Sequence, residues 1–360
     1  MTTARTQVFE NMAVDYVEFY VGDIGHNLDW LVDGYGCAVR ATSGPDDGQA
    51  PVRTFCVGQG DIDLLLTAPL ESDHPAAAYV ERHGDGVANI GLRVPDTAAA
   101  FAAAVRGGAR PVMAPTERDG IVTATIIGFG DVTHTFVQRP AGSAAHDAHG
   151  LVAVPGAEAG PGTGLRAVDH FAVAVEPGQI DATVEYYQRA LDFDLTLTER
   201  IVTGEQAMFI KVVQSKSRAV TFTLIESDAS MEAGHVDDFL KDHGGAGVQH
   251  MALSTGDILS SVRQLGERGV ELLSTPDTYY AALTERVRPD RHRVEDLRAL
   301  DILLDEDHDG QLYQIFAKSV HPRNTIFLEI IERAGASTFG SSNIKSLYEA
   351  VETQRNRDGN

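Results

Sequence analysis

The 360-residue chain carries 52 Asp and Glu against 29 Lys and Arg, a formal net charge of −23, and 43% of its residues are hydrophobic. This charge argues against nucleic acid or an anionic membrane as a partner, because both are bound by clustered Lys and Arg. The chain has two cysteines, no apolar run of about 18 residues and no apolar signal core in residues 1–11. We therefore expect a cytoplasmic protein without disulfides, with two domains at this length.

Alternating polar and apolar residues predict strands at residues 13–21, 52–57 and 62–66, and a glycine turn followed by a strand at 84–94. Asp96 can cap an Ala-rich helix over 97–106, which Gly107 and Gly108 end. Two further strands are expected within 123–139. Residues 140–164 are rich in Gly, Ala, Pro and His, which is typical of a connecting segment. We expect an N-terminal domain at 1–150, a linker at 151–164 and a C-terminal domain at 165–360.

Three strands of the second half each carry one side chain that can bind a metal. His170 lies within residues 168–175, His250 within 247–253 and Glu329 within 325–333. A lone histidine in a strand is usually a hydrogen-bonded core residue, but a carboxylate inside an apolar strand is costly unless it is paired or holds a metal. Two histidines and one carboxylate match the facial triad that holds non-haem Fe(II) and leaves positions open.

The second half repeats the first. Residues 167–170 match 13–16, and residues 245–250 match 84–89. Duplication for stability alone would explain a repeat, but here only the second half holds the metal-capable set. The offset grows from 250−89=161 to 329−135=194, which places 194−161=33 extra residues within 276–310. We interpret these as a solvated helical insertion. The first-half positions that correspond to the triad are occupied by Tyr16, Asn89 and Thr135.

These motifs together resemble the 4-hydroxyphenylpyruvate dioxygenase family. They are the strand-borne His170, Gly-Gly-Ala-Gly-Val-Gln-His at 244–250, Gln-Ile-Phe at 314–316 and Phe-Leu-Glu-Ile-Ile-Glu-Arg at 327–333. The resemblance runs from about residue 13 to 353 and is strongest after 165. It implies an α+β vicinal oxygen chelate fold, in which two domains of paired βαβββ modules form open barrel-like sheets and a C-terminal helix forms a lid. It also implies Fe(II) bound by the triad and an arylpyruvate and O2 as substrates; a homodimer is one expected assembly.

Two reactions share this family and its substrate. One forms homogentisate by attack on the ring, and the other forms 4-hydroxymandelate by hydroxylating the benzylic carbon. Ile225 stands where homogentisate-forming members usually carry Asn, Ile344 replaces a lid-helix Phe, and Leu328 replaces a Phe beside the carboxylate ligand. These positions resemble the mandelate-forming branch, which implies that a mandelate is supplied for antibiotic biosynthesis.

The resemblance also assigns the rest of the pocket. Gln249 and Gln314 are expected to be pocket or supporting donors, Thr223 a polar wall, and Phe339 part of the segment that leads to the lid. Asp169 neighbours a ligand but should point to the opposite face of its strand, so we interpret it as structural.

Two positions depart from the family pattern. Ile210 stands where the family usually has Ser. Because a hydroxyl donor is lost, the identity of the arylpyruvate substrate stays open. His235, where the family has Gln, is either a substitute donor or a surface histidine. Three alternatives remain: a homogentisate-forming dioxygenase, a glyoxalase-like Zn or Ni enzyme, which would use four protein ligands, and a non-catalytic binding protein, against which the intact triad argues.

Overall fold

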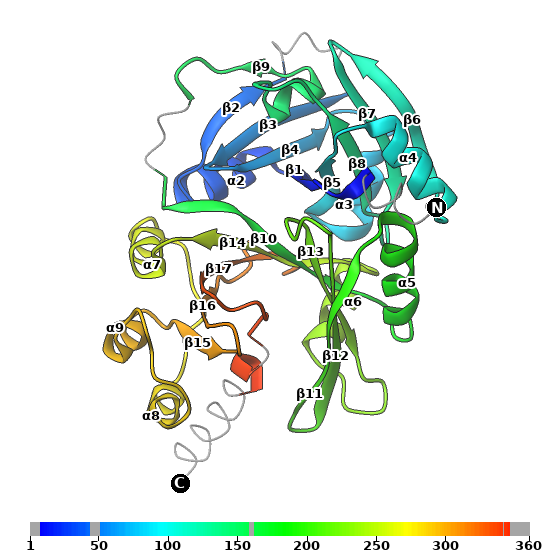
Figure 1. Cartoon of the computed structure of the whole chain (residues 1–360). Helices are drawn as coiled ribbons and strands as arrows, with labels where there is room; N and C mark the ends of the chain where they lie inside the picture. The colour runs from blue at the N-terminus through cyan, green and yellow to red at the C-terminus, as the bar shows by residue number, and fades with distance from the viewer. Residues whose placement is uncertain (1–7, 44–50, 158–161, 341, 346–360) are drawn as a thin grey trace.

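The computed structural model describes residues 8–43, 51–157, 162–340 and 342–345, and it contains two curved mixed sheets packed back to back (Figure 1). The first sheet has the strand order β6-β7-β8-β5-β1-β4-β3-β2-β9. Its strands are β1 (Ala13–Tyr20), β2 (Ala38–Thr42), β3 (Val52–Gln59), β4 (Ile62–Pro69), β5 (Gly86–Arg93), β6 (Pro111–Arg118), β7 (Ile121–Ile127), β8 (Thr133–Gln138) and β9 (Val152–Ala153).

The second sheet has the order β11-β12-β13-β10-β14-β17-β16-β15, which mirrors the first eight strands of the other sheet. Its strands are β10 (Leu165–Ala174), β11 (Asp194–Thr203), β12 (Gln206–Gln214), β13 (Thr221–Ser227), β14 (Gly247–Thr255), β15 (Leu303–Glu306), β16 (Gln311–Phe316) and β17 (Phe327–Ala334). This is the expected α+β vicinal oxygen chelate architecture.

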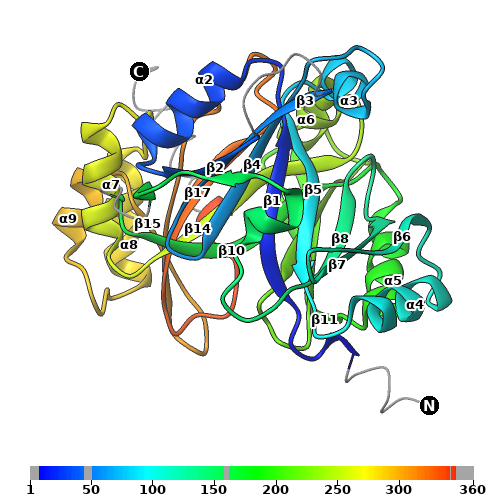
Figure 2. The same cartoon turned by 90° about the horizontal axis from the view of Figure 1, so that it is seen from above.

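Helices cover the ends and edges of the two sheets. In the first half they are α2 (Ile24–Leu28) with a π-helical turn (Asp29–Gly34), α3 (Pro75–His83) and α4 (Thr97–Arg106), and in the second half α5 (Ile180–Leu191), α6 (His235–His243), α7 (Ile258–Glu267), α8 (Asp277–Arg286) and α9 (Val294–Ala299). Helices α4 and α5 come from different halves and lie side by side (Figure 2). No helix in the described part of the chain is long and apolar enough to cross a membrane.

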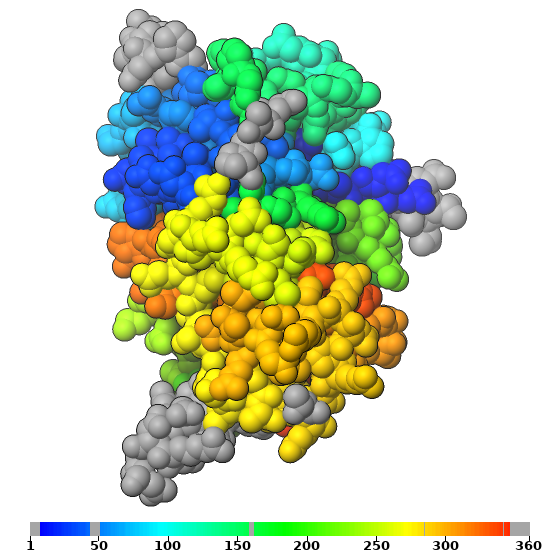
Figure 3. All heavy atoms as spheres, turned by 90° about the vertical axis from the view of Figure 1, so that its left-hand side faces the viewer, coloured from blue at the N-terminus to red at the C-terminus, as the bar shows by residue number. Residues whose placement is uncertain are grey.

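Local capping chemistry agrees with the sequence. The Asp96 carboxylate accepts a hydrogen bond from the Ala99 N–H at 2.9 Å, and Asp257 accepts one from the Ser260 N–H at 3.0 Å. Both satisfy an N–H that the first turn of the helix leaves free. The extra residues of the second half form α8 and α9, so the predicted helices are confirmed, but the insertion is not simply solvated, because Tyr279, Tyr280 and Leu283 of α8 are buried in the main core. In Figure 3, α7 lies directly beneath the N-terminal half and α8 and α9 lie below it; Arg268, just after α7, donates to the Asp33 carbonyl at 3.0 Å.

The main core lies between the two sheets and is built by both halves. The ring of Phe129 from the first half lies 6.0 Å from Phe222 of the second, and the His134 and Tyr187 side chains form a hydrogen bond of 2.7 Å across the same boundary. Smaller apolar clusters line the outer, concave faces. The shared core therefore holds the halves together and leaves each concave face available.

The connection between the halves is more structured than a linker. Residues 145–149 form a 3-10 turn, and β9 pairs with β2 as a ninth strand. Thr163 is fully buried and donates from its hydroxyl to the Tyr35 carbonyl at 2.8 Å. Only tertiary pairing reveals this, because the Gly- and Pro-rich composition gives no strand pattern. Of the expected lid helix, residues 342–345 are helical, and 346–360 lie outside the described residues.

Candidate metal centre and substrate pocket

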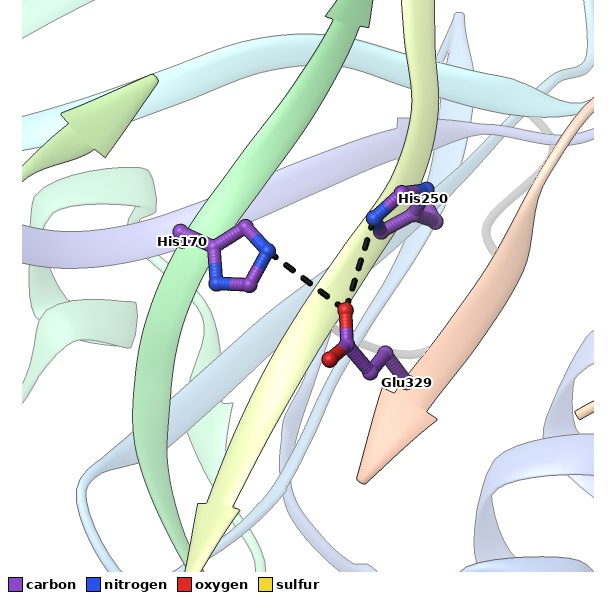
Figure 4. Close-up of side chains that lie close together, drawn as sticks. All are labelled: His170, His250 and Glu329. Atoms are coloured by element: carbon purple, nitrogen blue, oxygen red, sulfur yellow. Dashed lines mark ion pairs between the residues drawn. The ribbon is translucent and has the colours of Figure 1, made fainter. Parts of the chain in front are cut away.

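The three candidate ligands converge from neighbouring central strands (Figure 4). His170 comes from β10, His250 from β14 and Glu329 from β17. The Nε2 atom of each histidine lies 3.4 Å from Oε2 of Glu329, and the three ligand atoms lie within 4.8 Å of one another. His170 and Glu329 are both only 2% exposed. The fold therefore brings together residues that are up to 159 positions apart (329−170=159).

Both histidines sit at irregularities of the strand pairing. The register between β10 and β14 shifts between Val168 and His170, and again between Ala172 and Val173. A bulge places two consecutive side chains on nearly the same side of a strand. Asp169 consequently reaches His170, whose Nδ1 lies 2.8 Å from Asp169 Oδ1. The expectation that Asp169 points away from the ligand is therefore wrong, because it assumed a regular strand.

Gln249 occupies the same place beside the second ligand. Its Oε1 lies 3.3 Å from Nδ1 of His250. When Nδ1 of each histidine carries the proton and donates to these oxygens, both Nε2 atoms are unprotonated on the side of the site where Glu329 lies. Such partners fix the tautomer and the ring orientation of a metal-ligating histidine.

Arg333 completes the support of His170 and was not singled out from the sequence. It donates to both carboxylate oxygens of Asp169, each at 2.8 Å, and to the Thr338 carbonyl at 2.7 Å. Burial disfavours charge on Asp169, but the hydrogen bonds and charges of Arg333 and His170 together outweigh burial and lower the pKa of the carboxyl. The guanidinium also lies 4.9 Å from the ring centre of Phe339. Arg333 thus links a ligand to the segment that leads to the lid.

The electrostatics favour a bound cation. Burial opposes protonation of His170, yet Asp169 and Glu329 outweigh it and raise its pKa to about 9. Burial lowers the pKa of His250. Burial would raise the pKa of Glu329, but the hydrogen bonds and charges of the two histidines outweigh burial and lower this pKa. The Oε1 atom of Glu329 is buried with no hydrogen-bond partner among the described residues. A buried carboxylate oxygen without a donor fits a metal, and this donor set fits Fe(II).

The expected pocket residues mostly share the concave face of the second sheet. Ile210 pairs with Ile225 across β12 and β13, and both belong to one apolar cluster against which Phe339 and Ile344 pack. The Phe339 ring meets His170 edge-on at 5.0 Å. Thr223 lies on the same face, and its buried Oγ1 has no partner among the described residues.

Gln314 and Leu328 have different environments. Gln314 is buried beneath the lid segment, where its Oε1 accepts from the Asn343 side chain at 3.4 Å. Leu328 is buried in the shared core on the other face of β17, because alternation turns it away from Glu329. The expectation that Leu328 lines the pocket is therefore wrong. His235 is the first residue of α6 and its side chain is exposed, which fits a surface histidine better than a pocket donor.

The first half has a neutral hydrogen-bonded set at the corresponding place. Asn89 donates to the Tyr16 hydroxyl at 3.0 Å and accepts from the Thr135 hydroxyl at 3.1 Å. Tyr16 pairs with Gly91 as His170 pairs with Ala252, so the predicted correspondence is confirmed by strand register. These side chains satisfy one another without a metal.

Comparisons with known proteins agree with this architecture. Residues 13–148 match the family described as "Hydroxyphenylpyruvate dioxygenase, HPPD, N-terminal", and residues 167–315 match the "Glyoxalase/Bleomycin resistance protein/Dioxygenase superfamily". A 4-hydroxyphenylpyruvate dioxygenase from Aspergillus fumigatus is 32% identical over 96% of this chain and 93% of its own length. The chain belongs to the 4-hydroxyphenylpyruvate dioxygenase family.

Further relatives of this dioxygenase family include a 4-hydroxyphenylpyruvate dioxygenase from Dictyostelium discoideum, 32% identical over 96% of this chain and 99% of its own. A solved triple mutant of 4-hydroxymandelate synthase from Streptomyces coelicolor is 41% identical, with a TM-score of 0.85 over 95% of this chain and 98% of its own. A xylose isomerase-like TIM barrel/4-hydroxyphenylpyruvate dioxygenase fusion protein, 22% identical with a TM-score of 0.76, shares the fold over 97% of this chain and 53% of its own.

Proposed function

We propose that this dioxygenase uses Fe(II) and O2 to decarboxylate an arylpyruvate oxidatively and to hydroxylate its benzylic carbon. The products are a 2-hydroxy-2-arylacetate, 4-hydroxymandelate in the case of 4-hydroxyphenylpyruvate, and CO2. The observation that carries the proposal is the convergence of His170, His250 and Glu329, with one buried carboxylate oxygen left without a donor. The substrate's own 2-oxo acid makes an additional 2-oxo acid unnecessary.

Bound Fe(II) would supply O2 activation and a chelation site for the 2-oxo acid. The protein supplies three ligand atoms and the geometry that holds them. Asp169 and Gln249 accept the Nδ1 protons and keep each Nε2 free as a ligand. Phe339 packs edge-on against His170 and shields that side of the site from water. Water exclusion protects reactive oxidising chemistry from side reactions.

Two observations support benzylic rather than ring attack. The mandelate synthase is 41% identical to this chain, against 32% for the two dioxygenases compared above. Ile225 and Ile344 form part of the apolar wall around the concave face, where neither can hold the ring by a hydrogen bond. Without a polar anchor there, we expect the ring to turn so that the benzylic carbon is nearest the oxidant. Homogentisate formation is the second candidate, and the names of the curated relatives favour it.

Product analysis tests the proposal. Protein purified without oxygen would receive Fe(II), ascorbate, O2 and either 4-hydroxyphenylpyruvate or phenylpyruvate, with products identified by mass spectrometry. A mandelate with one oxygen atom from 18O2 on the benzylic carbon is expected. Homogentisate as the main product would refute the branch assignment but keep the metal site.

Iron content tests the ligands independently of turnover. Glu329→Gln is expected to lose most bound iron, because an amide cannot supply the negative charge of the triad. Thr135→Val, at the corresponding position of the first half, is the matched control and should keep it. Equal iron content in both variants would refute the assignment of Glu329 as a ligand.

A further inference from the structure

We propose that the preferred substrate is an arylpyruvate whose ring carries no hydroxyl at the end far from the metal, as in phenylpyruvate. This inference rests on the proposed function and names the substrate class of the same site. It follows from which side chains the strand register places at increasing distance from the triad.

The register sets two rows of side chains on the concave face. His250 pairs with Ala172, which pairs in turn with Thr223. One step along the strands, Ala174 pairs with Ile225. Neighbouring strands are about 4.8 Å apart and same-face residues about 6.6 Å apart along a strand. The floor beside the metal ligands is therefore made of two alanines, and it leaves room for a flat ring.

The far end of that ring meets isoleucine. Ile225 lies one strand beyond the alanine floor, and Ile210 pairs with it one strand further on. They are 5% and 4% exposed, and they share an apolar cluster with Val212 on β12 and with Phe239 of α6. Ile344 and Phe339 pack against this cluster from the lid segment. A hydroxyl at the end of the ring would lose water here and meet side chains that can neither donate nor accept.

Two polar side chains of the concave face, Thr223 and Glu199, do not lie at the far end of the ring. Thr223 stands in the row of Ala172 and His250, so its hydroxyl lies beside the ring nearer the metal than Ile225. Glu199 pairs with Ile210 on β11, the edge strand, about 5 Å beyond Ile210. That position is past the end of a single ring. Both groups have a buried oxygen without a partner among the described residues, so each is a testable alternative anchor.

The size of the preference can be estimated. Burying a hydroxyl without a hydrogen bond is unfavourable, and an apolar pocket rejects a near-isostere with an added hydroxyl by about 100-fold at most. We therefore expect kcat/KM for phenylpyruvate to exceed that for 4-hydroxyphenylpyruvate by about 10- to 100-fold.

The test uses the full-length protein loaded with Fe(II) and measures both kcat/KM values. Anaerobic calorimetry adds the two dissociation constants, which do not depend on turnover. Ile210→Thr places a hydroxyl at the far end of the substrate ring and should lower the ratio of the kcat/KM values, phenylpyruvate over 4-hydroxyphenylpyruvate, about tenfold. Ile210→Val, which has the same shape as the Thr variant without the hydroxyl, should keep the preference. Melting temperatures of both variants check that each is folded.

Three results would overturn the inference. One is equal or better use and binding of 4-hydroxyphenylpyruvate by the wild type. Another is the same preference in Ile210→Thr and Ile210→Val. The third is recognition of 4-hydroxyphenylpyruvate that disappears in Thr223→Val or Glu199→Gln, which would make one of those groups a phenol anchor. Tighter binding of phenylpyruvate without turnover of either compound would instead refute the proposed function and leave the ring preference standing.

Discussion

Protonation of His134 should destabilise the boundary between the two halves as the pH falls. This side chain of β8 is fully buried, its Nε2 lies 2.7 Å from the Tyr187 hydroxyl, and its ring stacks on Phe222 at 5.4 Å. Burial lowers its pKa to about 3, from an ordinary value of 6.5. Between those two values the unfolded chain binds a proton that the native protein does not, so the free energy of unfolding decreases as pH falls through this window.

The magnitude follows from the two pKa values. From pH 7 to pH 5 the unfolded state gains about 2 kcal/mol from protonation of this histidine, and the native state gains almost nothing while its pKa stays below about 4. Replacing His134 by Phe keeps a stacked ring but removes the titration. The loss of stability between pH 7 and pH 5 should therefore be about 2 kcal/mol smaller in His134→Phe than in the wild type.

Urea unfolding at both pH values, followed by far-UV circular dichroism with a chelator present, measures this difference. The chelator keeps iron dissociation out of the comparison. His308→Gln is the control, because this side chain is 82% exposed and its removal should leave the pH dependence unchanged. A His134→Phe variant with the full wild-type pH dependence would refute the assignment of buried, neutral His134.

The other predictions concern the metal site and the lid segment. Asp169→Asn should weaken iron binding about 10- to 100-fold in a competition titration with a chelator, because it removes a charged acceptor of the His170 proton. Asp15→Asn breaks the corresponding pair with Arg139 in the first half and should leave iron affinity unchanged; a similar loss in both variants would point to general destabilisation. Gly340→Ala should lower kcat/KM at least about tenfold with iron content unchanged, because φ is +74° and a Cβ would lie 1.9 Å from the side chain of Gln314. Wild-type kinetics in that variant would show that the turn at Gly340 does not position the pocket.

Features that depend on local pattern were predicted from the sequence. The three ligand residues were identified because a carboxylate within an apolar strand needs a special partner. The cap at Asp96 was predicted because an aspartate before an apolar periodic segment satisfies free helix N–H groups. Aligning the two halves of the sequence showed that only the second half has the metal-capable residues. This alignment was possible because both halves keep the same pattern of glycine turns and alternating strands.

Tertiary structure decided which way several of these side chains face. Asp169 supports His170 only because the pairing of β10 with β14 contains a bulge, and a bulge depends on the neighbouring strand rather than on local alternation. Leu328 belongs to the shared core because the second sheet packs its other face on the first half. Arg333 reaches Asp169 across 164 positions of sequence. Sequence periodicity determines which residues share a face of one strand, whereas register and packing determine what that face meets.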